Sequence, residues 1–325
     1  MTLAADPREP ARWSDYLALA RPDHWVKHIF IVPGIVLALL LRPQPIAEVL
    51  PRIVVGLISA CLLASANYVL NEWLDAATDR HHHTKSSRPA VSKQLSPLLV
   101  CLEYLLLVAV GLGLAWWISK QYLIVSGLFL VSGWIYNVPP IRTKELPFLD
   151  VISEAINNPI RLTLGWIMVD PSTLPPGSLL LAYWMGGAFL MALKRFAEYR
   201  SAEQEGRLDA LAIYRGSFRH YTEESLLLSS FLYALLAAFF LAVFLVKYRI
   251  EYLLSLPLFA ALFVMYLRVA LKDNSRVQAP EKLFRERALM LTVAVLGLAL
   301  VALTWVDIPV LEQLTSPHYI RIGTD

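Results

Sequence analysis

The stretch from Ile53 to Asp79, IVVGLISACLLASANYVLNEWLDAATD, decides the fold class, because an apolar run leads directly into an acidic motif. Residues 53–74 are long and apolar enough to cross a bilayer, which takes about 20 such residues. Asn71, Asp75 and Asp79 follow one another at intervals of four residues. Four residues advance a helix by about 400° and ~6 Å, so these side chains share one face. The stretch therefore predicts a transmembrane helix with a polar face at one end.

The composition of the whole chain also indicates a membrane protein. Its 325 residues are 57% hydrophobic and 17% charged, and the mean hydropathy is +0.53, whereas soluble domains are roughly 45–50% apolar and about 25% charged. We predict an all-α, polytopic bundle of nine transmembrane helices that forms a single domain over residues 1–325. The predicted spans are residues 25–41, 53–74, 98–118, 121–137, 149–168, 178–197, 225–246, 251–270 and 288–306.

Basic residues predict the orientation of the chain. With the N-terminus in the cytoplasm, most of the 29 Lys and Arg residues fall on the cytoplasmic side. The positive-inside rule therefore places residues 1–24 and the loops 75–97 and 198–224 in the cytoplasm. The net charge of +3 is too small to indicate nucleic-acid binding. The other side carries only Arg42, Arg52, Lys120, Lys247, Arg249 and Arg321.

The acidic motif predicts a magnesium site. Stacked carboxylates such as Asp75 and Asp79 repel one another unless a cation lies between them, and oxygen ligands suit Mg²⁺, which usually keeps waters and substrate phosphates as its other ligands. We prefer this interpretation to a solvated helix end, because ionisable residues at the end of an apolar span are usually functional. Lys85 and Arg88 follow closely and could neutralise a diphosphate. A transition-metal site at His81–His83 is disfavoured, because successive helical residues point about 100° apart.

A second polar group ends the sixth predicted span. Lys194 and Glu198 lie four residues apart and therefore on one helix face. Taken alone, they fit a surface salt bridge equally well, which would contribute only a few tenths of a kcal/mol. Together with the acidic motif they are candidates for the opposite wall of one pocket.

The fifth predicted span contains ionisable residues, which are expensive inside a membrane. Glu154, Asn158 and Arg161 fall at helical spacing, and Pro159 is expected to kink or loosen the helix. Arg161 could hold a phosphate with two hydrogen bonds. The alternative is an internal ion pair between Arg161 and Glu154.

A turn after the fourth predicted span supplies further cations. Tyr136 precedes two prolines, and Arg142 and Lys144 follow them. A plain basic loop explains this pattern as well as a contact with a phosphate or a lipid headgroup does.

On these residues the chain resembles the UbiA superfamily of intramembrane prenyltransferases. The likeness rests on the Asn71/Asp75/Asp79 motif, on Lys85 to Pro89, on the turn from Tyr136 to Lys144, and on the number of predicted spans. It implies an all-helical bundle around a central cavity that opens to the cytoplasm, with Mg²⁺ bridging two acidic motifs to a substrate diphosphate.

Within that superfamily the chain is similar to the polyprenyl-phosphate phosphoribosyltransferase branch. The aromatic-acceptor enzymes carry a second Asp-rich motif where this chain has Lys194 and Glu198. Exchanging a carboxylate for an ammonium removes a metal ligand and adds a phosphate ligand. Further similarity to this branch lies in Arg21-Pro22, Trp25-Val26-Lys27, Arg161 to Gly165, Lys194 to Glu198, and Arg215 to Tyr221.

The resemblance implies transfer of 5-phosphoribose from phosphoribosyl pyrophosphate to a polyprenyl phosphate of the decaprenyl type, with release of pyrophosphate. The product would be a precursor of arabinofuranosyl donors, made at the cytoplasmic face of a bacterial inner membrane. The expected catalytic residues are Asp75, Asp79, Lys194 and Glu198, with Asp75, Asp79 and Asn71 holding Mg²⁺. The expected substrate- and phosphate-binding residues are Lys27, Asn71, Lys85, Arg88, Tyr136, Arg142, Lys144, Asn158 and Arg161.

Three rival interpretations remain. A UbiA-type prenyltransferase would move a polyprenyl group from its diphosphate to an aromatic acceptor, and the altered second motif speaks against it. A transporter would need polar residues that continue to the outer face, whereas this sequence concentrates them on the cytoplasmic side. A purely structural protein leaves the acidic motif unexplained. The sequence leaves homo-oligomer formation open, because no motif predicts a number of subunits.

Overall fold

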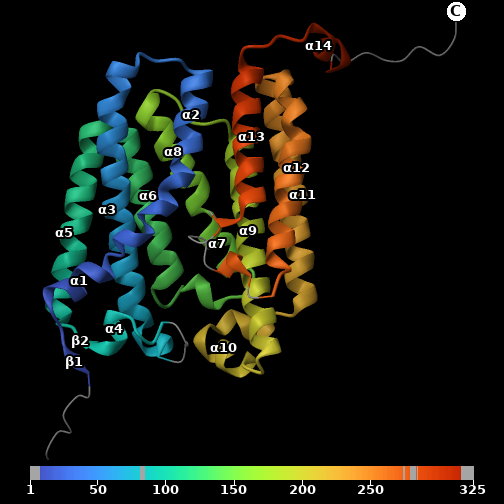
Figure 1. The fold of residues 1–325 in the computed structure, drawn as a ribbon. Coiled ribbons are helices and arrows are strands. Elements are labelled where there is room, and N and C mark those ends of the chain that lie inside the picture. The colour runs from blue at the N-terminus through green and yellow to red at the C-terminus, as the bar shows by residue number, and fades with distance from the viewer. Residues whose placement is uncertain (1–7, 81–84, 274, 279–282, 284, 316–325) are drawn as a thin grey trace, which may run out of the picture.

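The chain forms a bundle of long helices that run roughly parallel or antiparallel to one another (Figure 1). The computed structural model describes residues 8–80, 85–273, 275–278, 283 and 285–315. Strands in this part of the chain are limited to one parallel pair of two residues each, β1 (Glu9–Pro10) with β2 (Lys93–Gln94). The predicted all-α membrane fold is therefore confirmed.

The long helices are joined by short helical turns. The first half of the chain contains α1 (Trp13–Leu19), η1 (Pro22–Ile31), α2 (Val32–Leu41), α3 (Ile46–Asp79), α4 (Pro89–Ser92), α5 (Pro97–Ile118), α6 (Lys120–Asn137), η2 (Thr143–Glu145), α7 (Leu149–Ala155) and α8 (Asn157–Val169). The second half contains α9 (Gly177–Gln204), α10 (Leu208–Tyr214), η3 (Gly216–His220), α11 (Glu223–Tyr248), η4 (Ile250–Ser255), α12 (Leu256–Ala270), η5 (Arg276–Gln278), α13 (Arg287–Thr304) and α14 (Pro309–Thr315).

The predicted number of nine spans is not confirmed. Seven helical segments in the described part of the chain are long and apolar enough to cross a membrane. The two predicted spans that do not meet this criterion are residues 121–137, which form α6, and residues 149–168, which form α7 and α8. The seven segments are Trp13–Leu41, Ile46–Asp79, Pro97–Ile118, Gly177–Gln204, Glu223–Tyr248, Ile250–Ala270 and Arg287–Thr304.

The predicted fifth span is two helices rather than one. The regular helix is interrupted at Ile156, between α7 and α8. Pro159 explains the break, because its nitrogen carries no hydrogen and cannot bond to the carbonyl of Ala155. The Asn157 side chain donates instead to the backbone carbonyl of Glu154 at 3.0 Å. The expected loosening at Pro159 is thus present, and it allows α7 and α8 to face different neighbours.

Helix α3 is the longest helix, with 34 residues. At 1.5 Å per residue it is about 51 Å long, whereas the hydrocarbon core of a bilayer is about 30 Å thick. Its last turns, with Asp75 and Asp79, therefore extend beyond the apolar part of the span. We call the end of the bundle that carries Asp79 and α10 the motif end, and the opposite end, where α14 lies, the far end (Figure 1).

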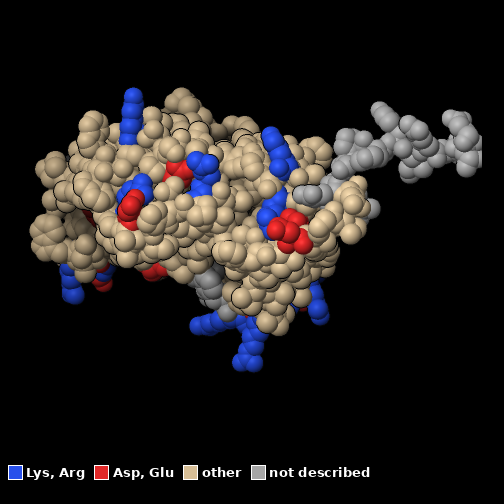
Figure 2. All heavy atoms as spheres, turned by 90° about the horizontal axis from the view of Figure 1, so that it is seen from above, with Lys and Arg blue, Asp and Glu red and all other residues tan. Residues whose placement is uncertain are grey.

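Apolar residues cover the outside of the bundle as well as its core. Leu106, Phe231 and Leu298 are exposed by 64%, 64% and 71% on three different helices. Such a surface suits contact with lipid tails and would be unfavourable in water. Viewed from above, the far end is largely uncharged, with charged side chains in scattered positions (Figure 2). The protein is therefore an integral membrane protein.

Close packing places α8 at the centre of the first half of the bundle. A Cβ atom at Gly34 of α2 would lie 2.0 Å from the carbonyl oxygen of Leu162, and one at Gly165 would lie 2.3 Å from that of Ile31. Glycine is needed at both positions, because any side chain would separate the backbones. The contact brings η1 and α2 against α8, and with them the polar residues of both segments.

Candidate functional site

The carboxylate of Asp75 is bound by two cations from the turn after α6. Lys144 Nζ lies 2.5 Å from Asp75 Oδ1, and Arg142 donates to the same oxygen at 3.0 Å. Lys144 also donates to Asn71 Oδ1 at 3.2 Å and to Asn137 Oδ1 at 2.9 Å. Burial lowers the pKa of Lys144 to about 8, while the neighbouring Asp75 carboxylate opposes that shift.

Asp79 lies one turn further along α3 and is fully buried. Its Oδ2 atom accepts a hydrogen bond from Arg88 at 2.6 Å, whereas its Oδ1 atom is buried without a partner in the described part of the chain. A buried carboxylate oxygen without a partner is costly, and a cation or a donor from a ligand would relieve that cost. We call Asn71, Asp75 and Asp79, with their cations Arg88, Arg142 and Lys144, the α3 wall.

The second polar group is centred on Arg195 of α9, which is only 1% exposed. Its Nε atom donates to Asp150 at 2.9 Å, and its two terminal nitrogens donate to Glu154 and Glu198, each at 3.0 Å. One guanidinium thus binds three carboxylates from α7 and α9. We call Arg195 and these three acids, with Tyr136, the α9 wall.

Tyr136 and the segment after α10 complete the α9 wall. The Tyr136 hydroxyl donates to Glu154 at 2.7 Å and accepts from Arg215 at 3.1 Å and from Arg195 at 3.3 Å. Asp150 accepts further hydrogen bonds from Ser217 and Tyr221. Burial raises the pKa of Tyr221, which keeps its hydroxyl protonated as a donor.

The two walls meet at the last turn of α6. Tyr136 belongs to the α9 wall, and the next residue, Asn137, accepts from Lys144 of the α3 wall. Lys144 Nζ also lies 6.0 Å from the centroid of the Tyr136 ring. The structure therefore brings together residues from three segments that are distant in sequence.

Lys194 differs from its neighbour Arg195. It forms no hydrogen bond or ion pair with any other residue that the structure describes, and its charge acts on Glu154 and Glu198. The predicted alternative of a Lys194–Glu198 salt bridge is therefore wrong, because Arg195 takes that carboxylate. The charges of Lys194 on α9 and of Arg88 on the α3 wall also act on His24 of η1.

Two more predicted cations line the same region. Lys27 Nζ is 2.9 Å from His24 Nδ1 and 5.7 Å from the centroid of the Tyr68 ring. Lys85 donates to the Tyr214 hydroxyl at the end of α10, and its charge also acts on Glu198. His81–His83 lie outside the described residues.

Arg161 lies apart from both walls. Its guanidinium carbon is 5.4 Å from the centroid of the Phe129 ring, and its Nε atom is buried without a partner among the described residues. The predicted alternative of an ion pair with Glu154 is wrong, because Glu154 is bound by Arg195 and Tyr136. Asn158, on the same helix, is partly buried beside Gly187 of α9.

The α3 wall fits a divalent cation that binds few protein ligands. Within the described ranges, no group of three or more His, Cys, Asp or Glu residues is placed to hold a metal ion. Asp75 and Asp79 nevertheless supply two carboxylates one turn apart. Arg88 donates only to Oδ2 of Asp79, and the Oδ1 atom has no hydrogen-bond partner among the described residues. Mg²⁺ is commonly held by one or two carboxylates, with substrate phosphates and water as the other ligands. The donor set therefore fits Mg²⁺ together with a phosphate substrate.

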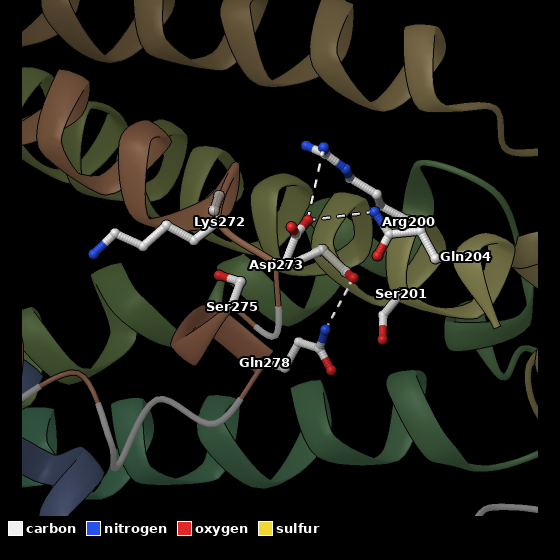
Figure 3. A pocket seen from close by; sticks show the side chains of 9 residues that line it. Arg200, Ser201, Gln204, Lys272, Asp273, Ser275 and Gln278 are labelled. Atoms are coloured by element: carbon white, nitrogen blue, oxygen red, sulfur yellow. Dashed lines mark hydrogen bonds and ion pairs between the residues drawn. The ribbon is translucent and has the colours of Figure 1, made fainter.

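A shallow pocket near the motif end of α9 is separate from this site (Figure 3). Arg200, Ser201 and Gln204 of α9 line one side of it, and the other side is lined by Lys272, Asp273, Ser275 and Gln278. Asp273 is bound by Arg200 at 3.9 Å and by Gln204 at 3.4 Å. The other polar side chains of the pocket bond to neighbouring residues, and none belongs to either wall.

Sequence reasoning misses the central residue of the α9 wall. Arg195, Asp150 and Arg215 lie within the motifs but receive no role from their spacing, although the structure joins them in one network in which Arg195 and Asp150 are buried. The available signal is an arginine inside a predicted span, which requires a partner within the bundle. Which carboxylates surround it depends on the break at Ile156, and sequence spacing does not reveal this.

The fold and the two polar walls define a class of helical membrane proteins with a buried site of carboxylates and cations near one end of the bundle. The family model for the UbiA prenyltransferase family matches residues 29–290. The chain therefore belongs to the UbiA prenyltransferase family.

Two curated relatives are decaprenyl-phosphate phosphoribosyltransferases. The protein from Mycolicibacterium smegmatis is 26% identical over 214 residues, which cover 66% of this chain and 64% of the relative. The protein from Mycobacterium tuberculosis H37Rv is 27% identical over 207 residues, which cover 63% of this chain and 65% of the relative. The chain thus spans slightly less than two thirds of the length of these relatives.

A solved structure confirms the fold. The UbiA homolog from Archaeoglobus fulgidus bound to GPP and Mg²⁺ has a TM-score of 0.66 and 21% sequence identity. The likeness covers 90% of this chain and all of the other.

Proposed function

We propose that this protein transfers 5-phosphoribose from phosphoribosyl pyrophosphate to a polyprenyl phosphate of the decaprenyl type, in the presence of Mg²⁺, and releases pyrophosphate. The whole chain would act as one domain. The names of the two mycobacterial relatives support this activity. The archaeal UbiA homolog, whose structure was solved with GPP and Mg²⁺, supports a divalent metal in this fold.

The observation that carries the proposal is that one arginine binds all three carboxylates of the α9 wall. Asp150, Glu154 and Glu198 are all bound by Arg195, whose charge makes them weaker ligands for a second metal that would bridge to a prenyl diphosphate. The neighbouring Lys194 keeps its charge available. A wall with satisfied acids and an available ammonium suits an anionic group of the substrate better than it suits a metal ion.

On the α3 wall, Asp75 and Asp79 would hold Mg²⁺, with Asn71 completing its shell or orienting the ribose. The bound ion would neutralise the diphosphate and ease its departure. Arg142 and Lys144 now bind Asp75 and would be released to the phosphates. Arg88 and Lys85 would bind the leaving pyrophosphate from the same side.

The reaction needs no general base. An oxygen of the lipid phosphate, already anionic, would form a bond to the anomeric carbon of the ribose. The bond from that carbon to the diphosphate oxygen would break, and pyrophosphate would leave with the electron pair. Lys194 and Lys27 would hold phosphate groups in place, and Glu198 would accept a hydrogen bond from a ribose hydroxyl. The catalysis would consist of positioning and electrostatic stabilisation.

The motif end would lie at the cytoplasmic face of a bacterial inner membrane, with the N-terminus in the cytoplasm. The cations of both walls and of the loop beside α10 lie at this end, which agrees with the positive-inside rule. A water-soluble donor could reach the site from this side, and the lipid would enter from the bilayer.

The proposal is tested by label transfer. Purified protein would be incubated with Mg²⁺, radiolabelled phosphoribosyl pyrophosphate and a polyprenyl phosphate, and label would be followed into the organic phase. We expect transfer that requires Mg²⁺ and is lost in Asp75→Ala and Lys194→Ala. Absence of transfer, together with prenylation of an aromatic acid from a prenyl diphosphate, would refute it and favour the aromatic-acceptor activity.

A further inference from the structure

Arg161 is a cation inside the bundle that forms no ion pair with a carboxylate in the described part of the chain. It forms no hydrogen bond or ion pair there, and its Nε atom is fully buried. Glu154, which the sequence offers as its partner, is bound by Arg195 and Tyr136. An ionised group in the membrane interior usually has a partner or a function, because its burial is costly.

Part of the Arg161 side chain remains accessible, although α8 is surrounded by other helices. Residues 157, 158, 160 and 161 are all partly accessible, whereas residues 162–169 of the same helix are buried. Helices α2, α3, α6 and α9 all pack against α8. The accessible surface of Arg161 therefore faces the inside of the bundle, where a ligand could meet it.

Phe129 contacts both Arg161 and Asn67 of α3, and this relates the position of Arg161 to the α3 wall. Arg161 lies over the ring of Phe129, and Asn67 donates to the carbonyl of Phe129 at 3.2 Å. Asn67 precedes Asp75 by eight residues on α3, which corresponds to about 12 Å along the helix axis. Arg161 therefore lies at the level of Asn67, deeper in the bundle than Asp75.

Most of the groups around Arg161 are polar and uncharged. Its charge acts on His28, whose Nδ1 atom is buried without a partner among the described residues, and it lies near Tyr68 and Tyr183. A guanidinium surrounded by an imidazole and aromatic rings can bind one anion by two parallel hydrogen bonds. The charge of Glu154 also acts on Arg161, but that carboxylate is bound by Arg195 and Tyr136.

We infer that Arg161 and His28 form a second anion site, which binds a phosphate monoester of a substrate deeper in the bundle than the diphosphate. This inference rests on the proposed function, in which both substrates carry such a group. The two sources are the 5-phosphate of the donor and the phosphate of the polyprenyl acceptor. The site would hold one substrate end while the α3 wall holds the diphosphate.

The test measures the binding of three probes to the purified full-length protein. The probes are ribose 5-phosphate, a short-chain polyprenyl monophosphate, and pyrophosphate with Mg²⁺. The variant Arg161→Met removes the charge and keeps an unbranched apolar side chain, and Arg161→Lys keeps the charge but loses the paired donors. Arg200→Met is the matched control at a partly exposed arginine of α9.

We expect Arg161→Met to bind one of the two monoesters roughly 10–100-fold more weakly, as fits loss of a charged hydrogen bond. Arg161→Lys should show an intermediate loss. Pyrophosphate binding should be unchanged in Arg161→Met, and Arg200→Met should match the wild type throughout. A loss for ribose 5-phosphate identifies the donor as the source, and a loss for the polyprenyl monophosphate identifies the acceptor.

Two results would overturn the inference: wild-type protein that binds neither monoester, or Arg161→Met protein that binds both as the wild type does. Should Arg161→Met fail to fold, modification of wild-type arginines by phenylglyoxal decides, because the bound monoester should protect Arg161 and absence of protection would refute the site. Failure of the proposed function gives a different result. In that case the wild-type protein transfers no label but still binds a monoester through Arg161.

Discussion

The α3 wall and the α9 wall contain the same kinds of groups but connect them differently. On the α3 wall each carboxylate meets cations that come from other segments, and Asp79 Oδ1 has no partner among the described residues. On the α9 wall a single arginine, Arg195, binds three carboxylates and is almost completely buried. The α3 wall can therefore exchange its partners for a ligand, whereas the α9 wall is a fixed support.

This difference assigns separate tasks to adjacent residues. Arg195 holds α7 against α9, and its loss would leave three acids without the cation that they share. Lys194 makes no comparable contact within the described residues and is available to a substrate. We therefore expect substitutions at Arg195 of the α9 wall to affect stability, and substitutions of the α3 wall to affect activity.

The largest effect is expected for Arg195→Met. The substitution removes from Asp150 and Glu154 the buried cation that they share, and breaking a buried ion pair costs about 3–5 kcal/mol. We expect a clearly lower unfolding temperature in detergent, measured by intrinsic fluorescence. Normal stability of this variant would contradict the supporting role of the α9 wall. Arg200→Met, which removes a partly exposed pair with Asp273, is the control and should change stability by less than about 0.5 kcal/mol.

The next largest effect concerns the exchangeable carboxylates. Asp75→Asn and Asp79→Asn keep the shape of the side chain but remove its charge, so transfer should fall by roughly 10²–10³-fold, as when a main electrostatic contact is removed. The unfolding temperature should fall less than in Arg195→Met, since the amide oxygen of asparagine can still accept a hydrogen bond from the cations that bind each carboxylate. Steady-state transfer assays over a range of Mg²⁺ concentrations would measure this. Full activity in either variant would exclude the α3 wall as the metal site.

A smaller loss is expected for Lys194→Met. Removing one phosphate contact should reduce kcat/KM for the donor roughly 10–100-fold, because a hydrogen bond to a charged group is lost. Lys194→Arg should restore part of the activity, and both variants should unfold at the wild-type temperature. A strongly destabilised Lys194→Met would show instead that Lys194 belongs to the support.

The smallest effect should follow from Tyr214→Phe. The Tyr214 hydroxyl accepts from Lys85, and its removal frees that lysine without changing the packing of α10. Loss of one such hydrogen bond is worth about 1 kcal/mol, which corresponds to roughly a fivefold change in KM for the donor. Lys85→Met should produce a larger change in KM. Identical kinetics for both variants and the wild type would remove Lys85 from the site.

Much of this architecture could be predicted from the sequence. The spacing of Asn71, Asp75 and Asp79 fixes their common face, because helix geometry alone determines it. The turn that carries Arg142 and Lys144 stands out in the sequence as a basic loop or a phosphate contact, and the structure brings it to Asp75. These predictions depend on local periodicity and on the cost of polar residues beside an apolar span.

The remaining features depend on tertiary contacts that spacing does not reveal. The interruption at Ile156 turns Glu154 towards Arg195 and leaves Arg161 without a carboxylate, although both lie on one predicted face. The choice of Arg195 over Lys194 as the partner of Glu198 is likewise decided by Asp150 and Glu154, which lie more than 40 residues away in sequence. The role of a charged residue in a membrane bundle is set by which partners lie beside it in space.

The most direct test of the account is a donor competition. Wild-type protein would receive equal concentrations of phosphoribosyl pyrophosphate and a prenyl diphosphate, with Mg²⁺, a polyprenyl phosphate and an aromatic acid, and the lipid products would be separated by mass. The account predicts phosphoribosylated lipid as the product, with its formation lost in Asp75→Asn and reduced in Lys194→Met. A prenylated aromatic acid as the sole product would contradict it, because it would mean that the α9 wall does not select a phosphoribosyl donor.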